Sequence, residues 1–139
     1  MPTVDINIWA VIIAALVNMA LGFWWYSQAG FGKPWMKEMG ITSDKIEASK
    51  KKGMGPSYLL ALVSAFVMAY VLAHIVDFAG ATTFGAGMVG GFWCWLGFIA
   101  TVGTAMVLWE GKSWRLYSIV MGYYLVALLL MGGLLATWQ

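Results

Sequence analysis

Hydrophobic residues occur along this chain in four long runs, separated by short segments that collect charged residues, glycine and proline. The runs extend over residues 6–26, 57–78, 84–109 and 114–138 and hold very few charged side chains. Each is long enough to cross a hydrocarbon core of about 30 Å as a helix that rises about 1.5 Å per residue. None alternates apolar and polar positions as a membrane β-strand does. The pattern therefore predicts an all-α membrane protein with four transmembrane helices.

Composition agrees with this fold class. Hydrophobic residues make up 62% of the 139 residues and charged residues 10%, with a mean hydropathy of +0.80; soluble domains average about 25% charged residues. The length suits a single transmembrane domain over residues 1–139. A net charge of +2 is too small to indicate a nucleic-acid partner, and the one cysteine, Cys94, forms no internal disulfide. Residues 1–7 contain no Lys or Arg and no A-x-A end follows the first run, so we expect that run to remain in the mature protein.

The basic residues predict an orientation. Six lysines lie between the first and second runs, and the other two cations lie between the third and fourth, so all eight share one side: Lys33, Lys37, Lys45, Lys50, Lys51, Lys52, Lys112 and Arg115. Loops rich in Lys and Arg stay in the cytoplasm. We therefore expect a multi-pass protein of the cytoplasmic (inner) membrane, with both termini outside and a cytoplasmic loop at residues 27–56.

Within that loop, residues 41–55 contain the signals of a short helix. Thr42 or Ser43 would cap it, and it would continue through Ile46 and Ala48. The lysines at 50–52 would then lie at the membrane surface. We favour an ordinary solvated loop here over a specific contact with anionic headgroups.

A short motif occurs twice. Gly32-Lys33-Pro34-Trp35 follows the first run, and Gly111-Lys112-Ser113-Trp114 follows the third. The repetition suggests two helical hairpins related by an axis along the membrane normal, which is a parallel repeat. Independent selection of Trp and Lys at a membrane interface would give the same motif, so the alternative of convergence stays open.

Small residues recur every fourth position in the first two runs, as at Ala10, Ala14 and Asn18 and again at Ala65, Ala69 and Ala73. The third run has small residues seven apart and a Gly87–Gly91 pair. Such stripes let helices approach closely. We expect the first three helices to form a tight bundle and the fourth, with its cluster of leucines, to face lipid. The stripes outnumber the contacts that one protomer needs, which favours a homo-oligomer. The alternative, in which one protomer satisfies all of them, stays open.

Few polar residues lie inside the runs. His74 and Asp77 are three apart on one helical face and form a candidate proton or cation site, or they merely end the helix and bond a neighbour. Asn18 lies mid-helix, where its amide either forms a hydrogen bond between helices or lines a polar path. Glu110 is expected to form an interfacial ion pair, with Lys33 as one candidate partner. No Ser-His-Asp grouping or metal-ligand spacing occurs, so we predict no catalytic residues, metal or cofactor and expect no enzyme.

The residues around the repeated motif resemble a known family. Trp25-Tyr26-Ser27, then Phe31-Gly32-Lys33-x-Trp35-Met36 and Gly40, and later Glu110-x-Lys112-x-Trp114, are similar to a family of small prokaryotic membrane proteins known only as a domain of unknown function. In that family Pro usually follows Trp-Tyr-Ser, whereas this chain has Gln28. The resemblance implies four helices in a membrane and no established activity. We call eight of these residues the interface motif: Trp25, Tyr26, Ser27, Lys33, Trp35, Glu110, Lys112 and Trp114.

Two functions fit these observations. The chain is either a small oligomeric transporter or channel for a small ion, with a path past Asn18 and the His74/Asp77 pair, or a non-transporting protein that holds a lipid, an apolar ligand or a partner protein. Transport requires a hydrated cavity that reaches Asn18. Binding requires a dry bundle with an aromatic-lined groove open to the membrane lipids. The sequence favours transport slightly.

Overall fold

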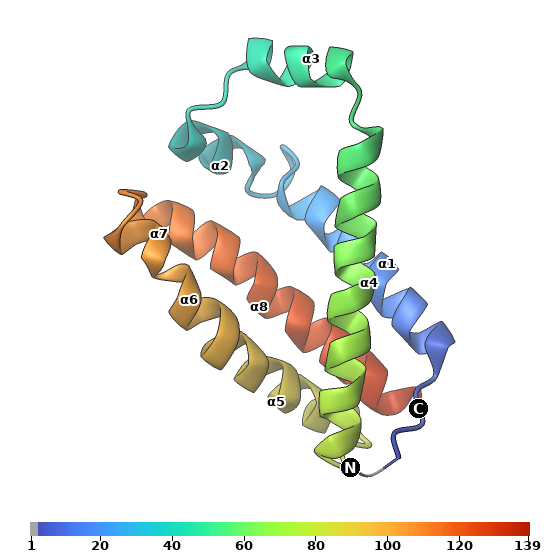
Figure 1. The fold of residues 1–139 in the computed structure, drawn as a ribbon. Helices are drawn as coiled ribbons and strands as arrows, with labels where there is room; N and C mark the ends of the chain where they lie inside the picture. Colours follow the sequence, from blue (N-terminus) through green and yellow to red (C-terminus); the bar gives the residue numbers. More distant parts are fainter. Residues whose placement is uncertain (1–2) are drawn as a thin grey trace.

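Residues 3–139 are described by a computed structural model, in which the third of four helical spans lies alongside the fourth and the second stands at an angle to both (Figure 1). The spans are α1 (Ile8–Trp25), α4 (Gly55–Phe78), a third span at Phe84–Leu108 and α8 (Trp114–Thr137). Each is long and apolar enough to cross a membrane, and the described residues contain no strand. The prediction of an all-α protein with four helices long and apolar enough to span a membrane is confirmed.

Local signals set the helix ends within two residues of the expected positions. Asn7 caps α1, where its Oδ1 accepts hydrogen bonds from the amides of Trp9 and Ala10 at 3.0 and 3.4 Å. The second span begins at Gly55 rather than residue 57 because Pro56 is tolerated in the first turn of a helix. Ser113 caps α8 by accepting the amide of Leu116 at 3.1 Å.

The third span is not the uninterrupted α-helix that its apolar run suggests. It consists of α5 (Phe84–Trp95), a π-helical turn η1 (Leu96–Ala100), α6 (Thr101–Gly103) and α7 (Ala105–Leu108). Hydroxyl groups compensate the altered backbone pairing. Thr101 donates to the carbonyl of Gly97 at 2.7 Å, and Tyr117 of α8 donates to the carbonyl of Ala100 at 2.7 Å.

The centre of the molecule is α8, which contradicts the expectation that the fourth helix faces lipid. Half of its most apolar 18-residue stretch is buried, against 11% for the third span. Glycines explain the difference, because a Cβ at Gly132 would lie 2.3 Å from the carbonyl oxygen of Gly87, and a Cβ at Gly91 would lie 2.1 Å from that of Leu128. The two helices therefore touch through their backbones, which the leucines of α8 do not reveal.

The expected small stripes of α1 and α4 do pack inside the protomer. Ala10, Ala14, Ala65, Ala69 and Ala73 are all buried in one core. Parts of α8 complete that core, including Leu128 and Met131.

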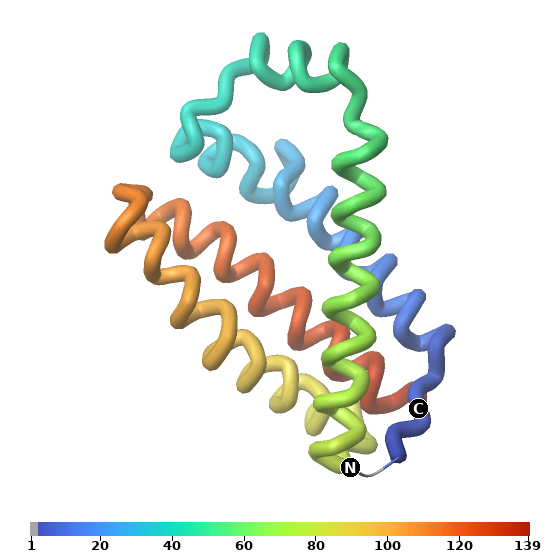
Figure 2. The backbone as a smooth tube through the Cα atoms, viewed as in Figure 1, coloured from blue at the N-terminus to red at the C-terminus, as the bar shows by residue number. Residues whose placement is uncertain are grey.

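Two short helices occupy the segment between α1 and α4. The expected helix is present as α3 (Ser43–Lys52), with Thr42 as its cap. An unexpected helix, α2 (Gly32–Met39), precedes it, and Gly40 ends α2 in the left-handed conformation at φ 65°. Figures 1 and 2 show α2, α3 and the α7–α8 turn at one end of the molecule, which we call the basic end because its segments hold all eight Lys and Arg residues. Both ends of the described chain lie at the opposite, terminal end.

Candidate functional site

A lateral groove of about 610 Å³ lies beside α4. Ligand pockets in proteins commonly measure about 300–1,000 Å³. Val63, Val67, Val71 and Phe98 in its wall are each about half exposed or more, so the groove opens sideways into the surrounding membrane. Its full lining is Val63, Ser64, Val67, Met68, Val71, Leu72, Ile75, Cys94, Phe98, Ile99 and Leu128.

The groove exists because α4 diverges from the third span. The two helices meet near the α4–α5 turn, where a Cβ at Gly90 would lie 3.8 Å from Val76. Towards the basic end α4 runs away from α5, α6 and α7, as both backbone views show (Figure 2). The π-turn contributes Phe98 and Ile99 to the opposite wall, and π-turns in helices often accompany functional sites.

The chemistry of the lateral groove is almost wholly apolar. None of its lining residues is ionisable except Cys94, and Ser64 carries the only hydroxyl. Most of the wall is aliphatic, with Phe98 as its one aromatic residue, so the lining is less aromatic than the binding hypothesis expects. Such a surface cannot coordinate an ion, but it can pack against a hydrocarbon chain.

Asn18 is buried at 5% exposure and lines neither the lateral groove nor the polar hollow beside Asp77. Its Oδ1 accepts a hydrogen bond of 2.6 Å from the hydroxyl of Tyr123, which also lies 3.2 Å from the Asn18 carbonyl oxygen. The pair therefore joins α1 to α8 in the middle of the bundle.

The imidazole of His74 and the carboxylate of Asp77 do not meet. Within the described residues no ion pair or hydrogen bond joins them. The Nδ1 atom of His74 lies 2.9 Å from the carbonyl oxygen of Tyr70, so its N–H tautomer donates there, and the two rings pack edge to face at 4.6 Å. Residues three apart share a helical face. The imidazole nevertheless forms its hydrogen bond with the backbone carbonyl one turn earlier, rather than with the carboxylate.

Asp77 instead faces the terminal end. It lines a polar hollow of about 410 Å³ together with Asp5, Asn7 and Gln139. The amide Nε2 of Gln139 donates to the carbonyl of Ala81 at 2.9 Å, which attaches the chain end to the α4–α5 turn. Among the described residues no group of three His, Cys, Asp or Glu side chains is placed to hold a metal ion.

The first half of the interface motif is a compact corner between α1 and α2. The indole Nε1 of Trp25 donates to the carbonyl of Ile119 at 3.0 Å, and Ser27 donates to the carbonyl of Trp24 at 2.6 Å. A Cβ at Gly32 would lie 2.5 Å from the carbonyl oxygens of Tyr26 and Ser27, so only glycine fits at this start of α2. Tyr26 packs against Trp35 with ring centroids 5.1 Å apart, while Lys33 is exposed.

The second half of the motif has a different backbone. Gly111 adopts φ 70° in a tight turn with open space around it, whereas Gly32 is buried. Trp114 packs against Tyr117 at 5.3 Å, and the amide of Lys112 donates to the carbonyl of Met106 at 2.9 Å. The two copies of the motif therefore differ in backbone conformation and in their surroundings, which favours convergence over duplication.

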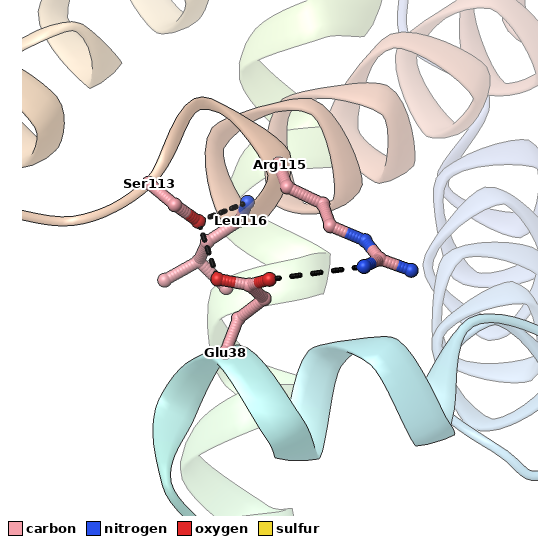
Figure 3. A network of polar contacts seen from close by, with 4 residues as sticks. All are labelled: Glu38, Ser113, Arg115 and Leu116. Atoms are coloured by element: carbon pink, nitrogen blue, oxygen red, sulfur yellow. Dashed lines mark hydrogen bonds and ion pairs between the residues drawn. The ribbon is translucent and has the colours of Figure 1, made fainter.

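The ion pair at the basic end involves Glu38 rather than Glu110. Figure 3 shows Glu38 of α2 between Ser113 and Arg115 at the start of α8. The Ser113 hydroxyl donates to Glu38 Oε2 at 2.6 Å, and Arg115 Nη1 lies 4.0 Å from Oε1. Glu110 forms no ion pair with Lys33 or with any other described residue. The cause is α2, which carries Glu38 across to the α7–α8 turn.

Comparison with known proteins identifies the family. A family described as "Protein of unknown function (DUF1761)" matches residues 9–136. The chain belongs to the DUF1761 family. The resemblance noted in the interface motif is therefore confirmed over almost the whole DUF1761 chain. Neither the curated proteins nor the solved structures contain a match.

Sequence reasoning missed Tyr123 and Glu38. A signal for Tyr123 was present: Asn18 lies seven residues before the end of α1 and Tyr123 nine residues after the start of α8, and both of these helix ends lie at the basic end (Figure 1). Their side chains therefore share one depth. Glu38 carried no comparable signal, because its position depends on a helix whose existence was not predicted.

Proposed function

We propose that this DUF1761 protein is a binding protein of the cytoplasmic membrane that holds an apolar chain, such as a lipid acyl chain, in the lateral groove. In this proposal it is neither a channel nor an enzyme. The observation that carries the proposal is the groove itself, which has a volume suited to a ligand and walls with almost no polar atoms.

The dimensions of the groove suit a hydrocarbon chain. Its α4 wall runs from Val63 to Ile75, which corresponds to about 18 Å at about 1.5 Å per residue. That length is comparable to one leaflet of a hydrocarbon core about 30 Å thick. A folded or branched polar ligand would leave its hydrogen-bonding groups unpaired against the valines, at a cost of about 1–3 kcal/mol for each group.

Transport fits the geometry less well. The transport hypothesis requires a hydrated cavity at Asn18, whereas the Asn18 side chain is buried and bonded to Tyr123. His74 is bonded to its own helix and Asp77 faces the terminal end. These residues therefore mark no continuous path among the described residues. A buried Asn18 and an open apolar groove are what the binding hypothesis expects, so the geometry favours binding.

The proposal includes an orientation, and it does not depend on a homo-oligomer. The positive-inside rule assigns the basic end to the cytoplasm and both termini to the outside. A parallel repeat is supported by the close packing of α1 with α4 and of α5 with α8, and is weakened by the different backbones of the two motif copies. A homo-oligomer is not required, because many of the small residues that favoured one, such as Ala69 and Gly91, are buried within the protomer.

The experiment measures lipids that stay bound after extraction from the membrane. The protein is taken from phosphatidylcholine nanodiscs into mild detergent, and retained lipids are counted by native mass spectrometry. Val67→Trp fills the groove, and Val89→Trp is a matched control because the two valines are 53% and 56% exposed and only Val67 lines the groove. We expect Val67→Trp to retain one lipid fewer than the parent and Val89→Trp to match it.

Two results would overturn the proposal. Equal lipid retention in both variants would show that the groove holds no chain, and a dimer that dissociates only in Val67→Trp would show that a second copy fills it. Proteoliposome flux of protons and simple ions supplies a separate check on conduction. We expect background flux in the parent; flux that is lost in His74→Ala with Asp77→Asn would restore the transport hypothesis.

A further inference from the structure

A second pocket, which we call the interface pocket, lies on a different part of the molecule from the lateral groove. It measures about 390 Å³ and shares no lining residue with the groove. Its walls come from α1, the segment after it, α2 and the first three turns of α8. The lining residues are Trp25, Phe31, Pro34, Arg115, Ser118, Ile119 and Gly122.

The pocket descends from the basic end into the apolar part of the molecule. Arg115, Ser118, Ile119 and Gly122 follow the spacing of one helical face on α8. Arg115 lies in the first turn of α8, and Gly122 lies seven residues further on, about 10 Å deeper at about 1.5 Å per residue. The pocket therefore has a charged residue at its rim, and its deepest part lies within the apolar part of the molecule.

The apolar wall is already fixed in place. Trp25 cannot rotate freely, because its indole Nε1 donates to the carbonyl of Ile119 at 3.0 Å. Gly122 makes room for the indole, since a Cβ there would lie 3.3 Å from Trp25 Cζ2. Phe31 packs against the same ring, with centroids 4.6 Å apart. Little ordering cost remains when a chain lies along this wall.

Arg115 is the only charged residue in the lining, and no acidic side chain accompanies it there. Its side chain is 61% exposed, and its contact with Glu38 is long at 4.0 Å. The Glu38 carboxylate is bound more closely by the hydroxyl of Ser113, at 2.6 Å. Because a guanidinium has five N–H donors in a fork that matches phosphate oxygens, most of its capacity is left for a ligand.

We propose that the interface pocket binds an anionic phospholipid from the leaflet at the basic end. Arg115 contacts the phosphate, and the upper part of one acyl chain lies along Trp25, Phe31 and Gly122. The combination of a single cation at the rim and apolar aromatic walls beneath it matches an amphipathic anion. A small soluble anion would gain nothing from those walls, and a neutral chain would gain nothing from Arg115.

The test measures binding of phosphatidylglycerol and phosphatidylcholine to the detergent-purified full chain by native mass spectrometry. We expect the first phosphatidylglycerol to bind the parent roughly tenfold more tightly than phosphatidylcholine, a difference of about 1.4 kcal/mol. Both lipids offer a phosphate to Arg115, but the choline cation of phosphatidylcholine is repelled by the guanidinium, whereas phosphatidylglycerol keeps its net negative charge. Arg115→Gln should remove that preference. Lys112→Gln is the matched control, because Lys112 is an exposed cation of the same end that does not line the interface pocket.

Two further variants separate a lipid site from a structural effect. Glu38→Gln breaks the same ion pair but retains Arg115, so it should keep or strengthen the preference for phosphatidylglycerol. Ser118→Phe fills the pocket and should weaken the first binding event about as much as Arg115→Gln does. Equal losses in Arg115→Gln and Lys112→Gln would mean that general surface charge attracts the lipid, and this would overturn the proposal, as would an unchanged preference in Arg115→Gln. Neither outcome depends on Val67, so failure here leaves the lateral groove untouched.

Discussion

The close approach of α5 and α8 predicts a large effect from one added methyl group. In Gly91→Ala the new Cβ would lie 2.1 Å from the carbonyl oxygen of Leu128, about 1.3 Å closer than the 3.4 Å at which ordinary contact begins. That oxygen belongs to the backbone of α8, so no side chain can rotate away. The two helices must separate by about 1 Å.

The cost follows from the lost packing. A gap of about 0.5–1 Å removes about a quarter to a half of the attraction between facing atoms, and overpacked cores commonly lose about 1–3 kcal/mol. Because the strain falls on two backbones, we expect Gly91→Ala to lower the free energy of unfolding by about 2–3 kcal/mol, near the upper part of that range.

The assay is unfolding in mixed micelles, titrated with sodium dodecyl sulfate and followed by circular dichroism. Gly85→Ala is the control, because it adds the same methyl group to α5 where no atom lies within 4 Å. It should be neutral, or should stabilise by up to about 1 kcal/mol through helix propensity. If the two variants differed by less than about 0.5 kcal/mol, α5 and α8 would not be in backbone contact and the central place of α8 would be wrong.

Two further substitutions test the polar contacts between elements. Tyr123→Phe removes the donor to Asn18 and should lower the free energy of unfolding by about 0.6 kcal/mol and at most about 1.7 kcal/mol, the range for hydrogen bonds between membrane helices; Tyr124→Phe, measured in the same titration, should cost less, and equal costs would remove the assigned role of the bond. Glu38→Ala should cost about 1 kcal/mol, because it removes a hydrogen bond and a partly exposed ion pair. Glu47→Ala in α3 should be neutral within about 0.5 kcal/mol, and a similar loss there would contradict the link between α2 and α8.

The helical spans were predictable because they depend on single segments of the chain. A run of about twenty apolar residues in lipid must satisfy its own backbone, which leaves the helix as the only economical conformation. Thr42 likewise identified the start of α3 through its local capping bond. Which helices pack against each other was not predictable from the sequences of the single segments. Gly132 matters because it faces Gly87, and Gly91 matters because it faces Leu128. No periodicity within either helix reports the identity of its neighbour.

For the candidate site too, features set by one segment were predictable, and features that depend on two segments were not. Asn18 was identifiable as a buried polar group, but its partner Tyr123 lies 105 residues away and is found only when α1 and α8 are placed side by side. The expected meeting of His74 with Asp77 was a local inference that failed, because the carbonyl of Tyr70 lies closer to the imidazole. The lateral groove arises from the divergence of two helices, a property that neither sequence segment possesses alone.

The central place of α8 has a consequence for biosynthesis. Chains enter the membrane from the N-terminus, so the helix against which α5 closes is the last of the four spans to leave the ribosome. Until then the third span, with its exposed glycines and its π-turn, has no close neighbour on the α8 side. Packing of the third span therefore waits for α8 (Trp114–Thr137), and a chain that stops at the α7–α8 turn would leave the membrane's quality-control proteases an intermediate in which α5 is unpacked.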